Sequence, residues 1–276
     1  MLSHHHVWQP FVLKKSILNT EHIREAETAV SCMIKLNIMK ALRLLSFMFA
    51  ALALSATSFA QSADEIITKH IQAIGGVENW KKINSVRQEA AISVQGMEIP
   101  VVITFVHNKA FKQEFTVMGM TGYSIITSEG GWNFNPMQGQ NKPEPVTADE
   151  LKYGKDQLDL QGEFIDYKAK GHTLELLPSE DVDGTNCFKV KITRKSGTES
   201  VYFFDPKTFY TIRATSKVVA NGQEVESTVN MSNFQKLPEG IVMPFTMENS
   251  QIPAPITITK VVINGPVDEA AFKVQQ

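Results

Sequence analysis

Segments with an apolar repeat of two residues fill most of the chain from Ser85 to Ile263, and they constrain its fold more than any other feature. Apolar and polar residues alternate in them, as in strands that bury one face. The connections are short and rich in Asn, Asp, Pro and Gly, which is typical of hairpin turns. Successive strands should therefore run antiparallel, as a meander. The predicted strands include those carrying Ile99, Val101, Ile103 and Phe105; Phe111, Phe115 and Val117; Phe188, Val190 and Ile192; and the ranges 200–204, 209–218, 224–234, 241–249 and 256–263.

A sheet of this size needs a cover. Roughly nine to eleven strands in one antiparallel sheet would leave two long edges and a large apolar face, unless the sheet curls into a barrel or half-barrel. A curled sheet encloses more volume than its own side chains readily fill. We therefore expect helices to pack inside the curled sheet or across its mouth.

Two helical segments are available as this cover. The first begins at Ser62, whose spacing to Glu65 is that of a capping box, and ends at Gly75-Gly76. A further turn or two is expected over 77–83. The second helix begins after Thr147, which can cap it. The first helix and the segment 77–83 each expose an apolar stripe that must pack on the sheet.

The N-terminal region predicts export. Residues 39–60 combine a basic start, an apolar run and small residues before the cut, as a cleavable signal peptide does. The apolar run is shorter than the ~20 residues that span a bilayer. Residues 1–38 are interpreted as an over-extended start, and 61–276 as a single domain. We expect a periplasmic protein without a lipid anchor, because Gln61 and not Cys follows the cut.

Composition argues against several function classes. The chain carries 27 Lys and Arg against 29 Asp and Glu, spread along its length, so neither nucleic acid nor an anionic membrane surface is an expected partner. Cys187 is the only cysteine after the predicted cut, so we expect no disulfide there and a structural role for this residue. After the predicted cut, His and Cys spacings typical of metal sites are missing, and His4-His5-His6 before it is interpreted as translated upstream sequence or a chance run and not as a metal site. We expect neither a metal nor a cofactor.

Six stretches carry a resemblance to a known family. They are "DEIITKHIQAIGGVENWKKINSV" (64–86), "GGWNFNPMQGQNKPEPVTADELK" (130–152), "DVDGTNCFKVKITRKSG" (181–197), "YFFDPKTFYTIRATS" (202–216), "NFQKLPEGIVMPF" (233–245) and "INGPVDEAAFKV" (263–274). Together they resemble the outer membrane lipoprotein-sorting-like proteins of Bacteroidetes-type bacteria. That family is part of the superfamily of periplasmic lipoprotein carriers and outer-membrane lipoprotein receptors.

The resemblance implies a fold and a function. The fold is mainly β with some α: an open, strongly curved antiparallel β-sheet, a half-barrel, with helices lidding a hydrophobic cavity. The function is to hold the acyl chains of a lipoprotein or lipid for transport to the outer membrane. An inner-membrane release complex and an outer-membrane acceptor are the partners that this implies, and we expect a monomer. Carriers of this kind keep their lid shut with a buried arginine on an early strand; Arg87 is the candidate here, and a surface arginine is the alternative.

An unusual stretch directs attention to the lid. Trp132, Phe134 and Met137 stand among glycines, asparagines and prolines, followed by a polar loop and the second helix. We expect them at the cavity rim or under the lid, with a plain core role as the alternative for Trp132. Methionines beside the strands fit a wall that adapts to variable contents. The expected ligand-binding residues are Ile67, Ile71, Ile74, Arg87, Ile103, Phe105, Phe115, Met118, Trp132, Phe134, Met137, Met231, Met243 and Phe245.

Two other functions compete with the carrier. One is a periplasmic interaction module whose own helices fill the sheet, and the other is a hydrolase that uses scattered carboxylates. Binding by burial needs no catalytic group, so we expect no enzyme. His70 is interpreted as a buried, satisfied histidine and Trp80 as a core residue. A residual apolar cavity of several hundred cubic ångströms would favour the carrier.

Overall fold

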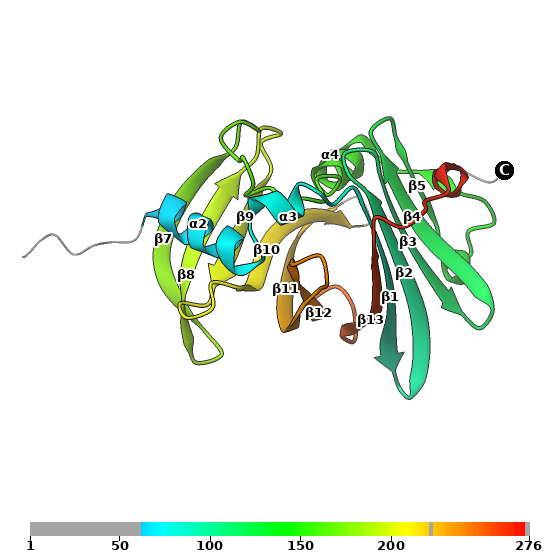
Figure 1. Ribbon diagram of the computed structural model, residues 1–276. Helices are drawn as coiled ribbons and strands as arrows, with labels where there is room; N and C mark the ends of the chain where they lie inside the picture. Colours follow the sequence, from blue (N-terminus) through cyan, green and yellow to red (C-terminus); the bar gives the residue numbers. More distant parts are fainter. Residues whose placement is uncertain (1–61, 221–222, 274–276) are drawn as a thin grey trace, which may run out of the picture. The chain divides into compact units, whose positions relative to one another are not determined.

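One antiparallel sheet of 13 strands dominates the computed structural model, which describes residues 62–220 and 223–273 (Figure 1). The expected extension at 1–38 and signal peptide at 39–60 lie outside these residues. The strands are β1 (Ser85–Val94), β2 (Met97–Val106), β3 (Ala110–Val117), β4 (Met120–Thr127), β5 (Gly131–Phe134), β6 (Glu144–Pro145), β7 (Thr173–Val182), β8 (Thr185–Thr193), β9 (Glu199–Phe204), β10 (Thr211–Ala220), β11 (Gln223–Lys236), β12 (Val242–Asn249) and β13 (Ile256–Ile263).

The strand order confirms the antiparallel meander and adds a join between its ends. The order is β6-β5-β4-β3-β2-β1-β13-β12-β11-β10-β9-β8-β7, so β1 pairs with the last strand and the sheet ends openly at β6 and β7. β13 pairs with β1 from Ile256 to Ile263 but with β12 at only Thr257 and Ile256. The last strand is thus attached mainly to the first.

The expected strand number was too low. β5 and β6 have four and two residues, and β7 is an edge strand with mostly exposed side chains. None of these three shows the regular alternation that a half-buried strand needs. The strands that the sequence predicts are confirmed within a few residues, and Asn108, Asp183 and Gly184 adopt a positive φ in the turns between strands.

Helix boundaries follow the predicted caps. The helices are α2 (Ala63–Ala73), α3 (Val77–Trp80) and α4 (Ala148–Asp156), with short 3-10 turns η1 (Pro136–Gln138) and η2 (Glu269–Phe272). Ser62 Oγ accepts a bond from Glu65 N at 3.1 Å, and Thr147 forms a full capping box with Glu150. Gly75 ends α2 with a φ of 114°. In the described part of the chain, no helix is both long and apolar enough to cross a membrane.

Helix α4 shows how strongly the sheet curves. Its Gly154 lies so close to β4 that an added Cβ would be 2.9 Å from Ile126 Cδ1, and the neighbouring Tyr153 donates a hydrogen bond to Glu224 on β11 at 2.8 Å. β4 and β11 are six strand positions apart. In a flat sheet that separation would be roughly 29 Å, so only a curved sheet lets one helix contact both strands. The predicted open half-barrel is confirmed.

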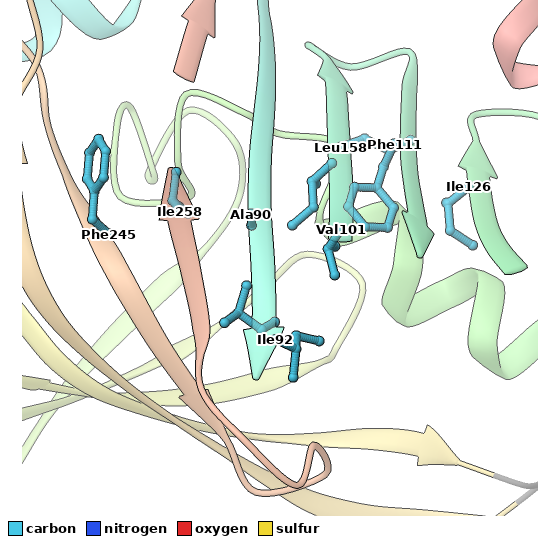
Figure 2. Packing of buried hydrophobic residues seen from close by; sticks show 10 residues of the cluster. Ala90, Ile92, Val101, Phe111, Ile126, Leu158, Phe245 and Ile258 are labelled. Carbon is cyan, nitrogen blue, oxygen red and sulfur yellow. The ribbon is translucent and has the colours of Figure 1, made fainter. Parts of the chain in front are cut away.

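The connection from β6 to β7 covers the concave face. These strands are the two edges of the sheet, so the chain between them, which includes α4, has to cross it. Three of its side chains enter three separate core clusters: Leu158 packs with the β1–β4 cluster, Phe164 with α2, β8 and β9, and Ile165 near Trp80. Figure 2 shows Leu158 beside Val101 and Phe111. The predicted covering role of this region and of α2 is therefore confirmed.

Candidate functional site

A cavity of about 440 Å³ remains between the cover and the concave side of β9–β12; we call it the central cavity. The end of α2, α3, the end of α4 and residues 157–164 form its cover. Its wall is divided chemically. The apolar lining consists of Ile74, Trp80, Phe164, Met231, Phe234, Val242, Met243 and Pro244. The polar lining includes His70, Asp156, Asp159, Glu163, Arg194, Glu199, Ser200 and Tyr202.

The apolar wall comes from β11, β12 and the α2–α3 turn. Met231 lies opposite Met247, which packs on the β1–β4 core cluster, so both face the concave side. Trp80 donates its indole hydrogen to Ile74 O at 3.0 Å and is 8% exposed. That bond satisfies the polar end of Trp80, so the ring can contribute apolar surface. Unbranched Met231 and Met243 give the opposite wall a shape that can adjust.

The polar wall centres on a buried ion pair. Arg194 Nε donates to Glu163 Oε2 at 2.5 Å, and both side chains are 12% exposed. The two terminal nitrogens of Arg194 donate to Thr198 Oγ1 at 3.4 Å and Ser200 Oγ at 2.9 Å. Burial alone would lower the pKa of Arg194, but the Glu163 carboxylate outweighs it, so the pKa lies above its ordinary value. This arginine is charged and its donors are engaged.

Two neutral aromatic groups lie beside this pair. Burial raises the pKa of Tyr202 well above its ordinary value, and the charge of Glu163 adds to the rise. Burial lowers the pKa of His70 to about 4, although its hydrogen bond to Phe209 O opposes the shift. Since that carbonyl can only accept, His70 Nδ1 carries the hydrogen and donates to it at 2.8 Å. His70 is thus the buried, satisfied histidine that the sequence predicts, and Trp80 is the predicted core residue.

Three of the expected ligand-binding residues line the central cavity: Ile74, Met231 and Met243. Most others lie in the surrounding core. Ile67 is 2% exposed between α2 and β8–β9, and Ile71 packs beside it. A further group packs in the core cluster formed by β1–β4, β12 and β13, and consists of Ile103, Phe105, Phe115 and Phe245. These side chains stabilise the walls behind the cavity, and ligand contact by them remains a prediction.

The aromatic stretch does not lie at the rim of the central cavity. Ile125 pairs with Trp132 while Ile126 pairs with Gly131, so Trp132 faces away from the concave side on which Ile126 lies. Trp132 packs there with Ile125 and with Phe272 of η2. The core role stated as the alternative for Trp132 is the correct one. Phe134 stacks obliquely on Tyr123, with ring centroids 5.6 Å apart.

Two methionines expected at the cavity or lid also lie elsewhere. Met118 is 81% exposed in the turn between β3 and β4, and Met137 lies half-buried in η1. Neither lines the central cavity. Residue type does not distinguish turn methionines from wall methionines, because methionine occurs here both within strands and in the turns beside them.

The expected lid-locking role of Arg87 is corrected by its position. Arg87 is exposed, pairs with Glu89 at 2.6 Å, and lies opposite Thr104 and Val262 on the convex side. A small cavity of about 200 Å³ adjoins it there. Among the arginines that the structure describes, Arg194, directly after β8, is largely buried, and it joins the crossing connection to the sheet through Glu163. Its stretch "TRKSG" has the composition of an ordinary exposed hairpin turn, so the sequence gives no signal for this role.

A second cavity of about 460 Å³ lies near β3–β6 and η1. Phe115 and Phe134, two of the expected residues, line it. Amide and hydroxyl side chains dominate the rest of its wall: Gln113, Ser124, Asn133, Asn135, Gln138 and Gln140. This polar lining makes it a poorer environment for an acyl chain than the central cavity.

No family model and no curated protein matches the chain. Among solved structures, it is similar to a domain from Vibrio parahaemolyticus provisionally named an outer membrane lipoprotein-sorting protein, with 12% identity, a TM-score of 0.46, and 76% of this chain and 95% of that one covered. A LolA superfamily protein from Nitrosomonas europaea gives 13% identity, a TM-score of 0.41, and coverages of 72% and 96%. A DUF1329 family protein from Desulfovibrio piger gives 14% identity, a TM-score of 0.41, and coverages of 74% and 95%. At such values the likeness concerns the course of the chain and not the activity.

Proposed function

We propose that this protein is a periplasmic carrier that binds the acyl chain of a lipid or lipoprotein in the central cavity and takes it to the outer membrane. The observation that carries the proposal is the cavity itself. Its volume of about 440 Å³ lies within the range of ~300–1,000 Å³ that is usual for small-molecule sites. The exported location is supported by the signal-like sequence at 39–60.

The cover leaves this volume unfilled although it packs tightly elsewhere. Ile66 and Ile67 of α2 are 0% and 2% exposed against β8 and β9, so the first helix fills its own part of the concave face. The space that remains lies beyond the end of α2, against Met231 and Met243. A module that fills itself completely would leave no such space, which is why we favour the carrier over the interaction module.

Burial of methylenes would supply the affinity. Each methylene removed from water contributes about 0.8 kcal/mol, so ten of them would contribute about 8 kcal/mol before the costs of ordering and association. Trp80, Phe164 and Phe234 would contact the chain from three sides of the cavity. No bond is made or broken in this binding, so the proposed role is not enzymatic.

The proposal can be tested by filling the cavity. Met231→Trp and Met243→Trp place a larger side chain in the apolar wall, and each should weaken the binding of monododecanoylglycerol at least tenfold in a calorimetric titration. Met118→Trp is the matched control, since Met118 is 81% exposed away from this cavity. Its affinity should equal that of the wild type. Unchanged binding in both wall variants, with wild-type unfolding midpoints, would show that acyl chains bind elsewhere.

A further inference from the structure

The polar wall of the central cavity holds two buried acceptor oxygens that lack a donor within the described part of the chain. Glu163 Oε1 and Asp159 Oδ1 are buried and accept no hydrogen bond within the described part of the chain. The cations beside these acceptors donate to other atoms: Arg194 to Glu163 Oε2, Thr198 and Ser200, and Lys170 to Asp159 Oδ2 and Gly162 O. A buried acceptor without a donor costs free energy that a suitable ligand group would recover.

Glu163 Oε1 is the stronger of the two acceptors. The Tyr202 hydroxyl lies near this carboxylate without a hydrogen bond of ordinary length to Oε1. A carboxylate oxygen can accept two bonds, so Tyr202 would not saturate it. Asp159 Oδ1 already lies 3.8 Å from His107 Nδ1, and the same carboxylate pairs with Lys170 through its other oxygen. A ligand donor therefore has most to gain at Glu163.

The charge of the lining points in the same direction. Four carboxylates line the cavity, on Asp156, Asp159, Glu163 and Glu199, against the two cations Arg194 and Lys217. His70 adds no positive charge, because burial lowers its pKa to about 4. The wall thus carries two more negative than positive charges. A carboxylate head group would meet repulsion from Glu163 and could not donate to its unpartnered oxygen.

We propose that the carried amphiphile has a hydrogen-bond-donating head group, a hydroxyl or an ammonium, which binds Glu163 while its acyl chain lies along Met231, Phe234 and Met243. This deepens the proposed function and rests on it. A free fatty acid anion is excluded as the preferred ligand. The head group and the chain would thus contact opposite walls of the same cavity.

Four probes with the same twelve-carbon chain test the head group at pH 7.4: monododecanoylglycerol, dodecylamine, dodecanoate and methyl dodecanoate. Calorimetric titration of the full protein should show the first two binding at least tenfold more tightly than the methyl ester, a difference of about 1.4 kcal/mol. Dodecanoate should bind more weakly than the methyl ester. Equal affinities for all four, or dodecanoate as the tightest ligand, would overturn the proposal while leaving an acyl carrier in place. Failure of all four to bind would overturn the proposed function as well.

The variant Glu163→Gln tests the residue. This variant removes one negative charge and leaves Arg194 without its counterion. The affinity for dodecanoate should therefore rise at least tenfold, and the affinity for dodecylamine should fall at least tenfold. Methyl dodecanoate should be unaffected and serves as the internal control for the cavity. Glu89→Gln is the matched control variant, because it also breaks a Glu–Arg pair, 2.6 Å long, but at an exposed position outside the cavity. Unchanged selectivity in a folded Glu163→Gln protein would contradict the proposal, and the wild-type probe series decides it if that variant does not fold.

Discussion

His70 should make the protein lose stability in mild acid. Its side chain is 7% exposed between Phe164 and Phe204, and burial lowers its pKa from 6.5 to about 4. Between these two values the unfolded chain binds a proton that folded His70 does not accept. The unfolded state is therefore favoured increasingly as the pH falls from 6.5 to about 4, and the loss is complete below that.

The magnitude follows from the size of the shift. The lowering of the pKa from 6.5 to about 4 corresponds to about 3 kcal/mol, most of which is lost by pH 4.5. The pKa values of His107 and His172 are also lowered by burial, so they add to the loss in the same direction. A comparison with a His70 variant isolates its share.

His70→Phe keeps an aromatic ring between Phe164 and Phe204 but cannot titrate. It loses the bond to Phe209 O, which lowers stability by about 1–3 kcal/mol at every pH. Urea unfolding followed by tryptophan fluorescence at pH 7.5, 6.5, 5.5 and 4.5 would give the free energy of unfolding of both proteins. The fall in the free energy of unfolding from pH 7.5 to 4.5 should be about 2–3 kcal/mol smaller in the variant. An equal fall in both proteins would refute the assignment of this pH dependence to His70.

Three further predictions concern stability and reactivity. Gly75→Ala should destabilise the protein by more than about 2 kcal/mol, because φ is 114° and the new Cβ would be 2.4 Å from Gly240 O. Gly139→Ala, at φ 82° with open space around it, should cost about 1 kcal/mol. Equal urea midpoints for the two variants would contradict this prediction. Arg194→Ala should lower the free energy of unfolding by about 3–5 kcal/mol, because it leaves Glu163 buried and unpaired. Arg194→Met combined with Glu163→Gln should lower it clearly less. A single variant as stable as the double variant would contradict this reasoning. Cys187 is 0% exposed, and burial raises the pKa of its thiol to about 11. In a Cys32→Ser background, its reaction with a disulfide reagent at pH 8 should be about 100-fold slower in the native than in the urea-unfolded protein. Comparable rates would refute its burial.

The sequence predicts the sheet well because its determinants are local. Alternation, turn residues and helix caps lie within a few residues of each other, so the strands from β8 to β13 and the caps at Ser62 and Thr147 follow from short windows. A short window does not predict β7, because it is an edge strand whose mostly exposed side chains show no regular alternation. The glycines, asparagines and prolines around Trp132 favour a loop at the rim, whereas Trp132 lies on the short strand β5 and packs on the convex side with Ile125 and Phe272.

The candidate site depends on contacts between distant parts of the chain. Glu163 and Arg194 are 31 residues apart. They meet because the crossing connection brings Glu163 to the end of β8, which directly precedes Arg194. The residue types alone suggest a polar loop and a hairpin turn. Their burial follows from topology, which no short window contains. The apolar wall was easier to anticipate, since Met231 and Met243 lie on strands that the pattern predicts.

The pairing of β1 with β13 has a consequence for the order in which the protein can assemble. Val86 pairs with Ile263 across almost the whole domain, and β13 is attached far more firmly to β1 than to its sequence neighbour β12. One hydrogen-bonding edge of β1 therefore stays unpaired until β13 has been synthesised. Contacts this far apart in sequence slow folding. A chain that crosses a membrane starting from its N-terminus would therefore stay incompletely folded, and so still able to cross, until its last residues have been synthesised.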